Sequence, residues 1–232
     1  MIFWQIYKKE WRENAFLWML LTGLTVVFVL LTYSGHITKD LYGLPFALGI
    51  FVFLIFNITI LKKEENYKTS FLLKSLPVPG WVVILAKVFW LFSSFLLYYF
   101  IWTIASWQHI YRQHFQLILD TQNLTLDILL ITILPLLTIV LMQFAHLAAY
   151  YVSRFRGFVS VWIFAISGYI TIRLSTFLGR VLRFLPSLAV YPKTYDNAGI
   201  YFVNSGILVA LAIITVILLL INGKLWDNTP SI

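Results

Sequence analysis

The stretch that decides the fold runs from Leu61 to Lys87 and reads LKKEENYKTSFLLKSLPVPGWVVILAK. It is a charged, interrupted segment between two long apolar runs. It begins with two lysines and two glutamates, continues through a short amphipathic piece, and breaks at Pro77 and Pro79. Apolar sequence resumes around Trp81. Because charged groups are costly in lipid, we expect this segment to lie in water between two membrane spans.

The composition of the whole chain indicates an integral membrane protein. Of its 232 residues, 61% are hydrophobic and 11% are charged, and the mean hydropathy is +0.87. A soluble domain has roughly 45–50% apolar and about 25% charged residues. The chain therefore has too few polar side chains to cover its surface, and the bilayer must be most of its solvent.

Charge and cysteine content exclude several kinds of partner and chemistry. In a membrane protein, a net charge of +8 reflects basic residues that gather in cytoplasmic segments, so it does not predict a nucleic-acid partner. The absence of cysteine excludes disulfides, thiol catalysis and Cys-ligated metals.

The apolar runs predict an all-α integral membrane protein that consists of a single transmembrane domain over residues 1–232. A span needs about 20 apolar residues to cross ~30 Å of hydrocarbon. The six predicted spans are residues 15–33, 44–61, 82–107, 128–152, 158–172 and 201–221, with the charged segment 62–80 between the second and the third.

Two further helices are predicted beside the membrane. Residues 1–14 have apolar and basic residues on different sides, with Trp4 and Trp11 as anchors, which is typical of an interfacial helix. A plain positive flank to the first span is the alternative. Leucine and other apolar residues recur at helical spacing from Leu174 to Leu185, between arginines, which predicts a short outer amphipathic helix that ends before Pro186. The sequence Asn222-Gly223-Lys224 predicts the end of the last helix.

Six spans place both termini on the same side of the membrane, and the basic residues indicate which side. With the N-terminus inside, the inner segments hold eleven Lys and Arg residues and the outer segments hold six. Because basic residues favour the cytoplasmic side, we expect a multi-pass protein of the cell membrane with both termini in the cytoplasm. The charged segment 62–80 is then cytoplasmic too.

A few polar residues fall within the predicted spans. Asn57 is interpreted as an interhelical hydrogen-bonding residue. Gln143 and His146, at i and i+3, share a helix face. Two roles are open for them: they line a transport pathway, or they only pack against a neighbouring helix, which is the favoured alternative. Lys87, near the start of its span, is expected to extend its amine to the membrane interface.

The sequence contains no recognisable catalytic or nucleotide-binding motif. GxxxxGK[ST], HExxH and GxSxG are all missing, so we predict no catalytic residue, no bound cofactor and no metal site in this chain. A secondary carrier usually needs an ionisable residue at membrane depth, and only His146 qualifies. We therefore expect the energy for any transport to come from another chain.

The charged segment resembles one found in ABC type-2 transporter permeases. The matching residues are Glu64-Glu65, Thr69, the run Leu72-Leu73-Lys74-Ser75-Leu76-Pro77-Val78, and Ala86-Lys87. The family pattern between its second and third spans is roughly E-x-E-x-G-T, a leucine-rich turn, S-L-P-V-S-R, and a lysine further on. The chain departs from it at Lys68, Phe71 and Pro79-Gly80, where Gly, a second acid and Ser-Arg are common.

The resemblance implies that this chain is the membrane-spanning subunit of an ATP-driven exporter. Its coupling helix would insert into a separate ATP-binding subunit through Glu64, Glu65, Lys68, Thr69, Phe71, Leu72, Lys74 and Ser75, and Pro77 and Pro79 would end that helix. Two such subunits would bind ATP and Mg²⁺, and a second copy or a related permease would complete the pathway. The abundant aromatic residues suit an amphipathic or hydrophobic cargo such as a peptide, drug or lipid-like molecule.

Other functions remain open on the sequence alone. A haem-export-type permease has a similar size and layout. A six-span membrane scaffold or assembly factor would need no cargo, and a secondary carrier or membrane enzyme would need a site that the sequence does not reveal.

Overall fold

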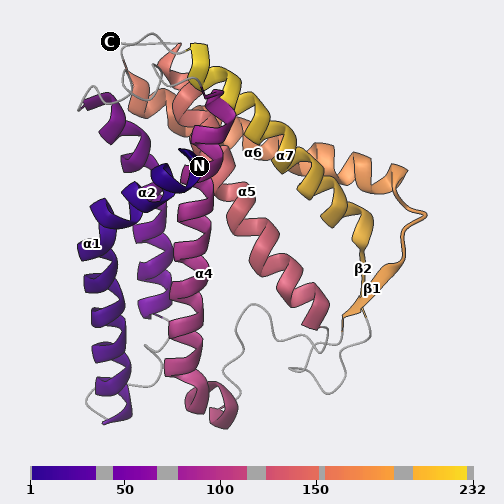
Figure 1. The fold of residues 1–232 in the computed structure, drawn as a ribbon. Helices are drawn as coiled ribbons and strands as arrows, with labels where there is room; N and C mark the ends of the chain where they lie inside the picture. The colour runs from indigo at the N-terminus through magenta and orange to yellow at the C-terminus, as the bar shows by residue number, and fades with distance from the viewer. Residues whose placement is uncertain are drawn as a thin grey trace. The chain divides into compact units, whose positions relative to one another are not determined.

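The computed structural model describes residues 2–34, 44–66, 78–113, 124–151, 155–190 and 201–228. This part of the chain is helical apart from one two-stranded sheet and short turns (Figure 1). The elements are α1 (Ile2–Tyr33), α2 (Leu44–Asn66), α4 (Gly80–Gln113), α5 (Leu124–Tyr150), α6 (Arg156–Val181), β1 (Ser187–Val190), β2 (Tyr201–Asn204) and α7 (Ser205–Asn228).

Five helices of the described part are long and apolar enough to cross a membrane. They contain the stretches Ile2–Tyr33, Gly80–Ile104, Ile131–Tyr150, Arg156–Val181 and Ser205–Asn228. Large apolar side chains along them are exposed, as expected where lipid is the solvent, and this agrees with a multi-pass membrane protein. The predicted span 44–61 falls within α2, which is not among these five, so six spans remain a prediction.

The chain forms two compact units, which are described separately. The first contains residues 1–78 and 85–115, and the second contains residues 79–84 and 116–232. The first unit therefore holds α1, α2 and most of α4, while the second holds the first turn of α4 together with α5, α6, α7 and the sheet.

In the first unit, the predicted interfacial helix and first span form one continuous helix, α1. Its N-terminal turns run at an angle to the rest of the helix (Figure 1). Three threonines on its buried side, Thr22, Thr25 and Thr32, donate hydrogen bonds to carbonyls one turn earlier. Their hydroxyls are thereby satisfied without water, which permits a polar stripe inside an apolar bundle.

Tyr98 joins the three helices of the first unit. Its hydroxyl lies 3.0 Å from the Thr25 hydroxyl of α1, and its side chain is fully buried. The ring lies against Gly49 of α2, where an added Cβ would come within 2.7 Å of the tyrosine oxygen. Glycine at position 49 therefore makes room for the α4 ring.

In the second unit, α5, α6 and α7 pack against one another. The predicted end of the last helix at Asn222–Lys224 is wrong, because α7 continues to Asn228. Asn222 is fully buried, and its side-chain amide donates a 2.9 Å hydrogen bond to the Val140 carbonyl of α5. An interhelical contact, and not a helix stop, explains why asparagine is found there.

The predicted boundary between a fifth span ending at residue 172 and a separate outer helix is also wrong. α6 continues through Arg173 to Val181 without a break. Arginine is a good helix former, and the Arg173 guanidinium donates a 3.0 Å hydrogen bond to the hydroxyl of Tyr169, one turn earlier. A charge that is unfavourable in lipid does not by itself end a helix.

The predicted last span began too early, because Tyr201–Asn204 is a strand. β2 pairs antiparallel with β1, with Ser187 opposite Asn204 and Val190 opposite Tyr201. Aromatic and β-branched residues favour strands, and β2 begins with Tyr201, Phe202 and Val203. The Asn204 side-chain oxygen accepts a 2.8 Å hydrogen bond from the Gly206 amide, so Asn204 caps α7, which begins at Ser205.

Candidate functional site

A buried ion pair joins α1 and α4 in the first unit. The Lys87 amine of α4 is 2.7 Å from the Glu10 carboxylate of α1, and the two side chains are only 0% and 3% exposed. The expectation that Lys87 reaches the membrane interface is therefore wrong. A buried opposite charge holds the amine in place because desolvation of either charge alone would be costly.

The helical spacing of α1 brings Glu10 to this position. Ile6, Glu10 and Asn14 recur every four residues and are all buried, so they share the face of α1 that packs inward. The Asn14 side-chain amide donates a 2.9 Å hydrogen bond to the Glu10 carbonyl. One turn from Glu10, the Tyr7 hydroxyl lies 3.1 Å from the Ser93 hydroxyl of α4.

Aromatic rings of α1 and α4 also contact one another. Phe89 of α4 meets the rings of Phe3, Trp4 and Tyr7 at centroid distances of 5.8, 6.4 and 5.4 Å. Trp90 meets Trp11 at 6.1 Å. These contacts fix the N-terminal turns of α1 against α4.

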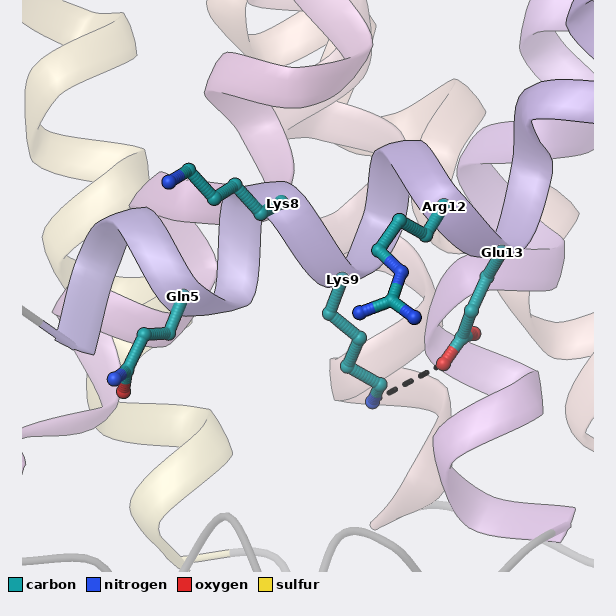
Figure 2. A pocket seen from close by; sticks show the side chains of 5 residues that line it. All are labelled: Gln5, Lys8, Lys9, Arg12 and Glu13. Atoms are coloured by element: carbon teal, nitrogen blue, oxygen red, sulfur yellow. Dashed lines mark ion pairs between the residues drawn. The ribbon is translucent and has the colours of Figure 1, made fainter.

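The other side of the same helix turns carries a basic hollow, defined by Gln5, Lys8, Lys9, Arg12 and Glu13. Gln5, Lys9, Arg12 and Glu13 project to one side, while Lys8 extends along the helix (Figure 2). The volume of the hollow is about 670 Å³, and it is open to the outside. Glu13 is 3.9 Å from the Lys9 amine and 2.7 Å from the Lys63 amine of α2.

The predicted coupling residues lie mostly outside the described residues. Glu64 and Glu65 occupy the last turn of α2, where only their backbone is described. Pro79 directly precedes α4, and its carbonyl accepts a 2.9 Å hydrogen bond from the Val82 amide. The remaining predicted residues, Lys68, Thr69, Phe71, Leu72, Lys74, Ser75 and Pro77, lie outside the described part. Their role stays a prediction.

Where the charged segment ends, the start of α4 crosses the end of α7 closely within the second unit. A Cβ added to Gly80 would lie 2.6 Å from the Gly223 carbonyl oxygen and would also meet the Asp227 carboxylate. A Cβ added to Gly223 would lie 2.5 Å from the Trp81 Cα. Two glycines thus permit backbone contact between the helices at this crossing.

The three polar residues predicted within the spans are divided between the two units. Asn57 is buried in the first unit, and Gln143 and His146 lie one turn apart on α5 in the second. Gln143 is fully buried, yet its side-chain amide makes no hydrogen bond to the described part of the chain. Within that part, no group of three or more His, Cys, Asp or Glu residues could hold a metal.

Two residues of these sites were missed by the sequence reasoning. Glu10 sits on the apolar side of the first helix, at helical spacing from Ile6, and an acid in that position is a signal of a buried partner. Asn222 carried no such signal, because asparagine before glycine also ends helices.

In comparisons with known proteins, no family model, no curated protein and no solved structure matches this chain.

Proposed function

We propose that the chain is the membrane-spanning subunit of an ATP-driven exporter of the ABC type-2 class. The observation that carries the proposal is the charged segment Glu64 to Ser75, which resembles that family's coupling helix and stands between two apolar helices. It is a single permease domain with both termini in the cytoplasm. It pairs with a second copy or a related permease, and it forms the pathway for an amphipathic or hydrophobic cargo.

In this proposal, a separate partner subunit hydrolyses ATP. The chain has no phosphate-binding loop, so a separate subunit binds ATP and Mg²⁺ and moves the coupling segment when it closes. Charged residues of that segment pair with the partner surface, while Phe71 and Leu72 fill an apolar pocket.

The contacts at both ends of the segment support such a role. On the α2 side, Lys63 is paired with Glu13 of α1 at 2.7 Å. On the α4 side, Gly80 and Trp81 contact the backbone of Gly223 in α7. A displacement of the segment therefore acts on packed helices at each end, and the Glu10–Lys87 pair makes α1 follow α4.

The proposal is tested by measuring the ATPase activity of the partner subunit with the reconstituted chain. We expect Glu64→Arg combined with Phe71→Ala to remove the stimulation by cargo or lipid. Arg183→Glu, an exposed change outside the segment, serves as the charge-altering control and should preserve it. Full stimulation in the double variant would show that the coupling assignment is wrong.

A further inference from the structure

The basic hollow on α1 is a site that the transport proposal does not use. Its lining residues occupy positions 5, 8, 9, 12 and 13, which is the spacing of one helix face. The opposite face of the same turns holds the buried Glu10. The hollow therefore belongs to a helix segment whose other side is fixed by packing.

The charge of the hollow is strongly positive. Lys8, Lys9 and Arg12 line it together with Glu13, and Lys63 lies beside it. The negative charge of Glu13 is offset by contacts with Lys9 and Lys63. Lys8 and Arg12 have no acidic partner among the described residues, so two cations are available to a ligand. The chemistry fits an anion with several acceptor oxygens, such as a phosphate.

The surroundings of the hollow place this anion at a membrane surface. Trp4 is 54% exposed and lies on the same turns, and tryptophan prefers the boundary between headgroups and acyl chains. Beyond Asn14, α1 continues directly into an apolar stretch in which Phe16 is 74% exposed. The hollow thus lies where a helix passes from polar to lipid-facing sequence, which is the depth of a phospholipid phosphate.

We propose that the basic hollow binds the phosphate of an anionic phospholipid, with Lys8 and Arg12 as the cationic ligands and Gln5 as a neutral donor. The rigid contact between α1 and α4 keeps these side chains on one exposed face before the lipid arrives, which lowers the entropy cost of binding. This site needs only a membrane-spanning chain and does not depend on the transport activity.

The test uses the full chain in detergent with phosphatidylglycerol or phosphatidylcholine added, and it measures bound lipid by native mass spectrometry. We expect a preference for phosphatidylglycerol in the unaltered chain. Lys8→Gln with Arg12→Gln should weaken that binding about 30-fold, since each basic residue near an anionic headgroup contributes a few-fold to about tenfold. Gln5→Glu, which removes no cation, should weaken it as well by repulsion.

The matched control is Arg180→Gln with Arg183→Gln, which removes the same charge from exposed positions outside the hollow and should leave binding unchanged. Circular dichroism of each variant checks that the helices remain. Equal losses in both double variants, or no preference between the two lipids, would overturn the proposal. So would full displacement of the lipid by millimolar inorganic phosphate, which would indicate a site for the free ion.

Discussion

Glu10 and Lys87 show how one buried pair fixes a helix against its neighbour. Removal of one partner leaves the other as an uncompensated buried charge, which typically costs ~3–5 kcal/mol. We therefore expect Lys87→Met to lower the thermal stability of the purified protein strongly, as followed by tryptophan fluorescence. The double variant Glu10→Leu with Lys87→Met should recover most of the loss, because two apolar side chains can replace a buried pair.

The matched control for this experiment is Lys63→Met. The Lys63–Glu13 pair has a similar distance but is 37% and 34% exposed, so solvent screens it and its contribution is ~0–1 kcal/mol. If the double variant were as unstable as Lys87→Met alone, the pair would not be the source of the stability.

The close crossing of α4 and α7 predicts that a larger residue at position 223 destabilises the protein. Gly223→Ala would press a methyl group against the Trp81 backbone, and overpacking of this kind typically costs ~1–3 kcal/mol. We expect a clear drop in melting temperature for this variant. Gly168→Ala in α6 is the control, because its Cβ would meet nothing within 4 Å and alanine favours a helix by ~0.5–1 kcal/mol. A Gly223→Ala protein as stable as the control would exclude the close crossing.

The sequence predicted helices well and their boundaries less well. Apolar runs identified four helices, because length and hydropathy alone define such segments. These helices include the predicted spans 15–33, 82–107 and 158–172, and residues 128–150 of the span predicted to end at 152. The failures have local causes. Arg173 and Asn222 were interpreted as helix ends, but both lie within helices. Arg173 donates a hydrogen bond to Tyr169 of its own helix, and the Asn222 amide donates one to the Val140 carbonyl of α5.

The candidate site was predictable only in part, because its contacts join residues that are far apart in the sequence. A charged residue near the end of an apolar run can reach the interface or meet a partner far along the chain, and only the fold distinguishes the two. Lys87 and Glu10 are 77 positions apart in sequence. The strand at residue 201 likewise depends on a partner strand at residue 187, which no local pattern reveals.

The orientation of the whole chain in the membrane is testable because the sequence contains no cysteine. A single cysteine at Arg180, an exposed residue near the end of α6, should react with a membrane-impermeant maleimide added from outside intact cells. A cysteine at Lys224, exposed on α7, should react only after the membrane is opened. The reverse pattern would place the termini and the charged segment outside the cell.

The most direct measurement is the isolation of the tagged chain from native membranes in mild detergent, with identification of the proteins that accompany it. A permease that relies on a separate ATPase should bring down a soluble subunit with a GxxxxGK[ST] loop, in a ratio near one to one. We expect this subunit to accompany the unaltered chain and to be lost from the Glu64→Arg, Phe71→Ala variant. Isolation of the intact chain without any such subunit would contradict the proposed function.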